Sequence, residues 1–326
     1  MSKASTAAAA GERGFILLDL HHPIIVETLR DLFGKDAKKE PMDVKFADFD
    51  DVEYQILVTP EQKDIVLLSV KMRAGSDLLL MGSKAVLDST FKTAVQSQPE
   101  KGYDVTLKFD VTKLPSSDAE KDALIKNCSE VRRIIMGAPF ERCFDALSKD
   151  AAGSLKPMII NYREKESIYL YPSADRVLVF FSIDFLDDTD RAIAVVFLQE
   201  FQEAQRRVQN APAVSFSKDA PGQLKSVPGF KEAPTCVGYV MFTLFKLHVD
   251  KPAKVVNAAN LLQGFRAYLH YHIKASKSYL QTRMRTRVEL LLKVLNRANP
   301  ATEAAETAAG RRNTGVGAGQ KTFRRF

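Results

Sequence analysis

The segment from Pro252 to about Asn296 constrains the fold of this 326-residue chain more than any other. After Pro252 it contains no further proline and a single glycine, Gly264. Apolar or small side chains recur along it with a mean spacing of about 3.7 residues, close to one helical turn. The pattern predicts one nearly straight helix roughly 67 Å long, because each helical residue adds about 1.5 Å. One small domain cannot cover such a rod.

Large apolar residues form a stripe along this predicted helix. They are Leu262, Phe265, Leu269, Ile273, Leu280, Leu291 and Leu295. The first third of the helix can cover the protein's own sheet. The distal part needs another surface, which favours the helix of a partner protein. The alternative is a helix that packs entirely within this chain.

The net charge of +7 is unevenly distributed. Residues 1–250 carry a net charge of −5, residues 251–299 carry +9 with Glu289 as their one acidic residue, and residues 300–326 carry +3. A solvated helix face normally mixes both signs, so the basic helix predicts docking against an acidic polymer or protein surface. The basic side chains beside the stripe are Lys274, Lys277, Arg283, Arg285 and Arg287.

Two similar units precede the long helix, each with the order strand–strand–strand–helix–strand–helix. Alternation of apolar and polar residues predicts the strands, and apolar spacing of three to four predicts the helices. The first unit has expected strands at 44–49, 52–58, 65–72 and 103–111, and helices at 77–95 and 118–148, the latter interrupted at Gly137 and Pro139. The second has strands at 158–163, 167–171, 176–185 and 237–249, a helix at 190–207 and an extra short strand at 213–217. A strand at 15–20 and a helix at 23–33 come before both units.

The predicted fold class is therefore α+β, with two similar α/β sandwich units, each an antiparallel sheet with helices, followed by the long C-terminal α-helix. The expected division is a disordered extension at 1–13, a first α/β domain at 14–150 and a second at 151–250. The helix at 251–299 completes the second unit, and 300–326 form a disordered basic tail.

Catalytic and metal-binding motifs do not emerge from the residues. The three cysteines form no paired spacing, and His270 and His272 point about 200° apart on a helix, so they cannot share a metal. The aspartates at 48–51 suit a strand–strand turn, and those at 187–190 suit a helix start. We expect no enzyme activity, cofactor, metal or small-molecule substrate. No apolar run reaches the roughly 18 residues of a transmembrane segment, and the cysteine usage fits a reducing, cytosolic setting.

Several segments carry a resemblance to a known family. FRAYLHYHIKASKSYLQTRMRTR at 265–287 and LKVLNRANP at 292–300 resemble the C-terminal helix of subunit 2 (p34-Arc type) of the actin-related protein 2/3 complex. VKFADFD at 44–50, RVLVFFSIDF at 176–185 and VFLQEFQEAQRR at 196–207 extend the resemblance in the same order. Residues 1–13 and the tail after Pro300 depart from the family pattern.

The resemblance implies a non-catalytic scaffold subunit of the seven-subunit complex, located in the cytoplasm with the actin-rich cortex or protrusions. It implies pairing with subunit 4 through the long helices, contact with other subunits, and contact with the mother actin filament during nucleation and branching. The apolar stripe would then face the partner helix or the protein's own sheet, and the five basic residues would contact actin. The alternative is nucleic-acid or anionic-membrane binding through the basic helix, although no nucleic-acid-binding module is visible.

Overall fold

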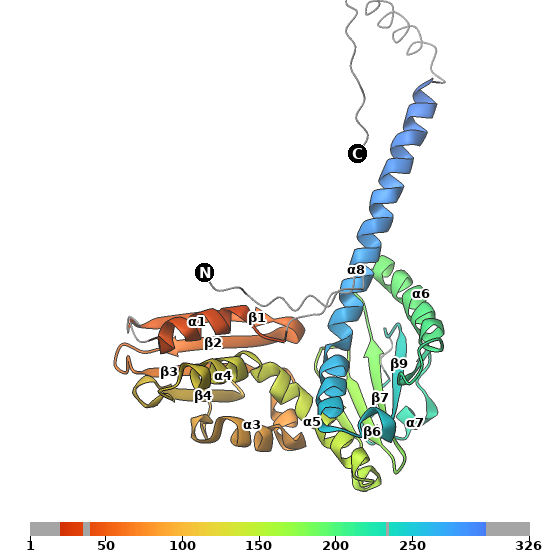
Figure 1. The fold of residues 1–326 in the computed structure, drawn as a ribbon. Coiled ribbons are helices and arrows are strands. Elements are labelled where there is room, and N and C mark those ends of the chain that lie inside the picture. The colour runs from red at the N-terminus through yellow and green to blue at the C-terminus, as the bar shows by residue number, and fades with distance from the viewer. Residues whose placement is uncertain (1–19, 35–39, 233–234, 298–326) are drawn as a thin grey trace, which may run out of the picture. The chain divides into compact units, whose positions relative to one another are not determined.

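The computed structural model describes residues 20–34, 40–232 and 235–297 (Figure 1). One compact unit ends at Ile273, inside the long helix α8 (Pro252–Arg297). The part of α8 from Lys274 onward belongs to a second unit and is described by itself. The predicted extension at 1–13, the tail at 300–326 and all but the last residue of the predicted strand at 15–20 lie outside the described residues.

The first sheet is antiparallel, with the strand order β1-β2-β3-β4. Its strands are β1 (Met42–Asp48), β2 (Val52–Val58), β3 (Ile65–Lys71) and β4 (Val105–Asp110). Alternate residues such as Tyr54 and Ile56 on β2 are buried, as the apolar alternation predicts. The helices of this half are α1 (Pro23–Phe33), α2 (Gly75–Leu78), α3 (Lys84–Phe91) and α4 (Asp118–Ser129).

The second sheet is also antiparallel and has the order β5-β6-β7-β9-β8. Its strands are β5 (Met158–Ile160), β6 (Ile168–Pro172), β7 (Arg176–Ile183), β8 (Ala213–Ser217) and β9 (Gly238–Phe245). The helices α6 (Asp188–Gln205) and α7 (Gly222–Lys225) belong to this half. Two antiparallel sheets with helices and a long C-terminal helix confirm the predicted α+β class.

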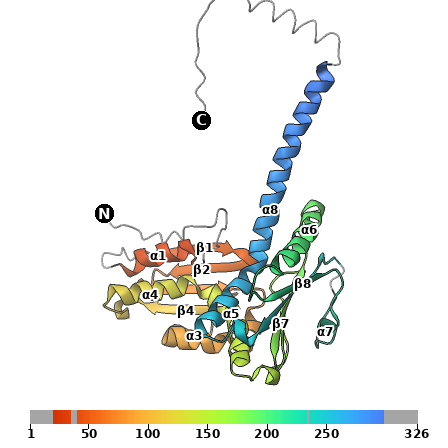
Figure 2. The ribbon, with the colours of Figure 1, turned by 45° about the vertical axis from the view of Figure 1, so that its right-hand side comes forward.

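Helix α5 (Val131–Ser148) joins the two halves of the compact unit. It contacts α2 and α3 of the first half and strands β6 and β7 of the second (Figures 1 and 2). Its buried residues belong to one hydrophobic core that runs from Ile25 to Ile273. The domain boundaries expected at residues 150 and 250 stay predictions.

The interruption expected at Gly137 and Pro139 is wrong, because α5 runs through both residues. The break lies earlier, at Glu130, whose φ of −97° and ψ of 10° separate α4 from α5. Pro139 has no backbone N–H, so the carbonyl of Ile135, four residues earlier, loses its helical partner. The buried hydroxyl of Ser83 donates to that carbonyl at 2.7 Å instead. A side chain from another helix thus replaces the missing hydrogen bond.

Two other element boundaries differ from expectation. The helix expected at 77–95 is broken at Gly82, whose φ of 118° is left-handed and disfavours residues with a side chain. The strand expected at 237–249 ends at Phe245, and a short 3₁₀ turn at Lys246–His248 follows it.

Ser83→Ala tests the hydrogen bond that supports α5. Leaving the buried Ile135 carbonyl unpaired should lower the free energy of unfolding by about 1–3 kcal/mol, measured by urea unfolding. Ser89→Ala is the matched control, because that exposed hydroxyl bonds only the Val86 carbonyl of its own helix. In a Pro139→Ala background, which restores the N–H, the effect of Ser83→Ala should shrink; an unchanged effect would contradict the explanation.

Candidate partner-binding helix

The first half of α8 packs on the second sheet through one face. Val255, Ala259, Leu262, Leu269 and Ile273 are buried there at helical spacing. The half-buried Phe265 lies at the centre of an aromatic cluster from three elements. Its ring centroid is 5.0 Å from that of Phe181 on β7, 4.9 Å from Phe242 on β9 and 6.1 Å from Phe201 on α6. The predicted stripe therefore covers the protein's own sheet as far as Ile273.

A buried ion pair holds this part of the helix on the sheet. Arg266 and Glu166 are each 3% exposed, and Arg266 Nε donates to the two carboxylate oxygens at 2.7 and 3.0 Å. The guanidinium also donates to the Asp184 carbonyl at 2.8 Å and lies 4.2 Å from the ring centroid of Phe185. Glu166 accepts a further hydrogen bond from the Asp184 N–H at 2.7 Å. The pair is therefore neutralised and hydrogen-bonded, as a buried charge requires, except that Arg266 Nη1 has no hydrogen-bond partner among the described residues.

The ion pairs continue from Glu166 toward the first sheet. Arg163 lies 3.3 Å from Glu166 and 2.5 Å from Asp50, at the turn between β1 and β2. Arg132 on α5 approaches the other oxygen of Asp50 at 2.6 Å. A chain of charges therefore connects the first sheet, α5, the second sheet and α8. We call it the charge chain, and it consists of Arg132, Asp50, Arg163, Glu166 and Arg266.

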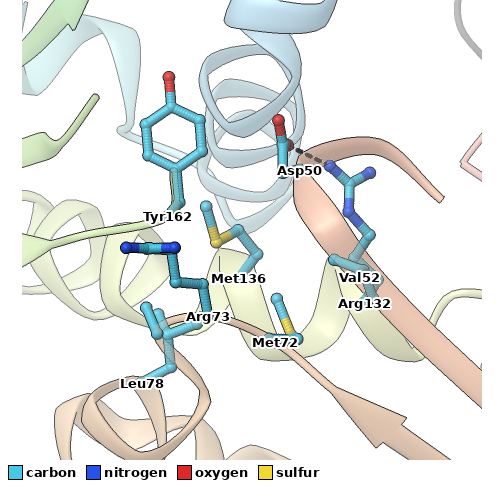
Figure 3. A pocket seen from close by; sticks show the side chains of 9 residues that line it. Asp50, Val52, Met72, Arg73, Leu78, Arg132, Met136 and Tyr162 are labelled. Carbon is cyan, nitrogen blue, oxygen red and sulfur yellow. Dashed lines mark hydrogen bonds and ion pairs between the residues drawn. The ribbon is translucent and has the colours of Figure 1, made fainter. Parts of the chain in front are cut away.

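The surroundings of the charge chain leave little room for a ligand. Figure 3 shows the Asp50–Arg132 pair beside Tyr162, Arg73 and Met136 around a cavity of about 10 Å³, which holds at most about one water. Burial, and then the nearby Glu166 carboxylate, raises the pKa of the Tyr162 hydroxyl well above its ordinary value. Tyr162 therefore stays neutral at physiological pH, and this cavity offers packing rather than a substrate site.

The aspartates and histidines that the sequence singled out have structural roles here. Asp48 accepts from the Phe49 N–H at 2.7 Å, and Asp187 accepts from the Asp190 N–H at 3.0 Å at the start of α6. His270 and His272 stack on Phe185 and Phe197. Among the described residues, no cluster of three metal-ligating side chains could hold an ion. Nor does any helix of the described ranges have the length and apolarity needed to cross a membrane.

The second half of α8 is exposed along its whole surface. Every residue from Ser278 to Arg297 is exposed, including Leu280 at 43%, Leu291 at 58% and Leu295 at 57%. Successive helical residues turn by about 100°, so these three leucines fall within about 40° of the direction of Ile273. The stripe that is buried up to Ile273 therefore continues in phase but without a cover in the described part of the chain. Such clustered apolar exposure is typical of an interaction surface.

The predicted basic residues divide into two groups by their direction on the helix. Lys277 and Arg287 lie within about 40° of the stripe, whereas Lys274 and Arg285 lie about 100–120° from its centre. Arg283 lies between, with its guanidinium 5.3 Å from the ring centroid of Tyr279. Arg283, Arg285 and Arg287 are exposed. The roles of these five residues and of the stripe in partner binding stay predictions.

The sequence patterns did not predict the charge chain. Arg266 is the one signal that could have revealed it, because it stands among buried apolar residues on the sheet-facing side of α8. A charged residue in an apolar stripe needs a buried partner of opposite sign. The partner, Glu166, is 100 residues away in the chain, so the sequence could not identify it.

Arg266→Met tests the anchor of α8. It would leave the Glu166 charge buried beside the aliphatic side chain, so the free energy of unfolding should fall by about 3–5 kcal/mol in urea unfolding. Arg176→Met removes an exposed pair with Asp175 and should cost at most about 1 kcal/mol. Adding Glu166→Gln to Arg266→Met should recover part of the loss. Equal effects of the two arginine substitutions would refute a buried anchor.

Similarity to known proteins extends over most of the chain. Residues 68–302 match the family model described as "Arp2/3 complex, 34 kD subunit p34-Arc". The chain is 39% identical to actin-related protein 2/3 complex subunit 2 of Dictyostelium discoideum over 87% of this chain and 94% of that protein. It is 38% identical to the protein of the same name from Schizosaccharomyces pombe over 90% of this chain and 98% of that one. The family model covers most of the chain, and both relatives match nearly end to end. The chain therefore belongs to the P34-Arc family of Arp2/3 complex subunits.

Proposed function

We propose that this chain is a structural, non-catalytic subunit of the Arp2/3 complex in the cytoplasmic actin cytoskeleton. The observation that carries the proposal is the distal half of α8, where the buried stripe continues as an exposed apolar face. Membership of the P34-Arc family and the names of the two relatives support the Arp2/3 complex as the assembly to which it belongs. Such a subunit would contribute to actin nucleation and branching by positioning other proteins, not by converting a substrate.

The partner proposed for the exposed stripe is subunit 4 of the same complex. The exposed stripe residues Leu280, Leu291 and Leu295, together with the exposed Met284 and Val288, form a row spaced at three or four residues. This spacing suits a second helix that packs along the first, with side chains of each helix in the grooves of the other. Fully burying one such side chain contributes about 1.5–3 kcal/mol, so several together can hold a stable pair.

The mother actin filament is the partner proposed for the basic residues. If the partner helix covers the stripe, Lys277 and Arg287 lie at the edge of that interface. Lys274 and Arg285 point farthest from it and remain directed at another acidic surface. Charges at the rim of an interface speed association and make it sensitive to salt. Contact with the filament would therefore weaken as ionic strength rises.

Aspartate substitutions in the stripe test the pairing. Leu280→Asp with Leu291→Asp should reduce co-purification of the other Arp2/3 subunits at least tenfold, because two charges would enter an apolar interface. Thr282→Asp with Thr286→Asp adds the same charge on the side of the helix that points about 140–180° away, and should leave assembly unchanged. Normal assembly of the leucine variant would exclude the stripe as the subunit interface.

Charge reversal at the two outward cations tests filament contact. Lys274→Glu with Arg285→Glu should leave assembly intact, weaken co-sedimentation of the complex with actin filaments several-fold, and reduce the salt dependence of binding. Lys63→Glu with Lys101→Glu makes the same charge change at exposed positions of the first half. Loss of assembly would instead assign the cations to a subunit interface. Stronger binding of the wild-type complex to a short DNA duplex than to filaments would favour the nucleic-acid alternative.

A further inference from the structure

Residues 288–295, close to the described end of α8, have a wider apolar surface than the rest of the distal helix. We call this segment the tip. Six of its eight residues are apolar and each is exposed by 54–61%: Val288, Leu290, Leu291, Leu292, Val294 and Leu295. The other two, Glu289 and Lys293, are also exposed and lie one helical turn apart.

The apolar side chains of the tip point over more than half of the helix circumference. Successive helical residues turn by about 100°, so Leu290 and Leu292 point about 100° to either side of Leu291. The other three apolar residues of the tip point between these two limits. Glu289 and Lys293 share the remaining side. The apolar arc of the tip is therefore about 200° wide.

The apolar arc is much narrower over residues 274–287. Leu280 and Met284 lie within about 20° of the direction of Leu291, and the cations Lys277 and Arg287 lie about 40° from it on opposite sides. One helix packed along the stripe could cover this narrow arc. A helix on the surface of a globular protein typically buries an arc of about 100°, so one flat contact would leave part of the tip uncovered. The tip needs contacts from two directions.

The charge of the distal helix favours a different protein over a second copy of this chain. Residues 274–297 contain seven lysines or arginines, and Glu289 is their one acidic residue. Two such helices side by side would place like charges against each other, which weakens association. An apolar surface bordered by carboxylates would instead match both the tip and the cations that precede it.

We propose that the tip inserts into an apolar cleft between two structural elements of another subunit of the complex, with carboxylates at the mouth of the cleft beside Arg287. The inference rests on the proposed function and deepens it. The partner of the stripe contacts residues 274–287 along one line, whereas it encloses the tip from two sides. The tip is then the part of the distal helix that holds the partner most strongly, because it buries the most apolar surface.

Cysteine labelling in the purified, assembled complex tests the enclosure. Leu290→Cys and Leu292→Cys, made one at a time, should react with a maleimide at least about tenfold more slowly than Lys293→Cys, because a cleft would cover both sides of the tip. Leu291→Cys reports on the stripe itself. Cysteine is a small apolar residue, so each variant should still assemble. Peptide mass spectrometry separates the new cysteines from Cys128, Cys143 and Cys236.

The pattern of protection distinguishes the cleft from simpler contacts. Slow labelling at residue 291 with fast labelling at residue 290 or 292 would overturn the cleft and leave the helix pairing intact. Fast labelling at all three positions would contradict the pairing as well. Protection that falls on dilution of the complex would identify a second copy, and protection that needs vesicles rich in phosphatidylserine would identify a membrane; either result overturns the proposal.

Serine substitutions measure how much the sides of the tip contribute to assembly. Leu290→Ser with Leu292→Ser should reduce co-purification of the other subunits at least about fivefold, because both residues would lose apolar contacts in the cleft. Glu289→Ser with Lys293→Ser changes the polar side of the same turns and should have less than about a twofold effect. Equal effects of the two pairs would also overturn the cleft.

Discussion

The buried pair of Arg266 and Glu166 fixes where the long helix lies on the second sheet. Both side chains are almost completely buried. Glu166 accepts a hydrogen bond from the Asp184 N–H, and Arg266 donates one to the Asp184 carbonyl. A slip of α8 by one turn would move Arg266 by about 5.4 Å, leaving its buried charge without a carboxylate and Glu166 with only Arg163 beside it. Apolar contacts tolerate small slips, whereas a buried, hydrogen-bonded ion pair does not. The pair therefore fixes the position of α8 on the second sheet more than it adds to the free energy of unfolding.

The charge chain extends this control to the first sheet. Asp50 lies at a turn with a left-handed φ of 63° and pairs with Arg132 from α5 and with Arg163 from the loop between β5 and β6. Because Arg163 also approaches Glu166, the turn of the first sheet and the first half of α8 depend on one set of charges. Together with the shared hydrophobic core, this makes residues up to Ile273 one unit. The proposed scaffold role would need such a fixed base.

Local patterns predicted most of the strands and helices, because alternation and helical spacing report which side of an element is buried. The prediction was wrong at Pro139, where the propensity to break a helix was overridden by the hydroxyl of Ser83 from a distant segment. The same limit applies to the turn between β1 and β2. Its aspartates predicted a turn, but nothing near them in sequence predicted that Asp50 would be part of the charge chain. Residues such as Asp50 and Arg163 are 113 positions apart, and their pairing has no local signature.

The sequence by itself determined that a long amphipathic helix with a basic surface follows two similar α/β units, because periodicity and charge are properties of neighbouring residues. Its motifs also indicated the family. Only the tertiary structure decided where the stripe stops being internal core, at Ile273, and becomes exposed surface, as at Leu280. The apolar pattern is continuous along α8, so the covered and the exposed halves of this helix look the same in sequence. The extent of the sheet beneath the helix decides which half is covered, and that extent depends on contacts between residues far apart in the chain.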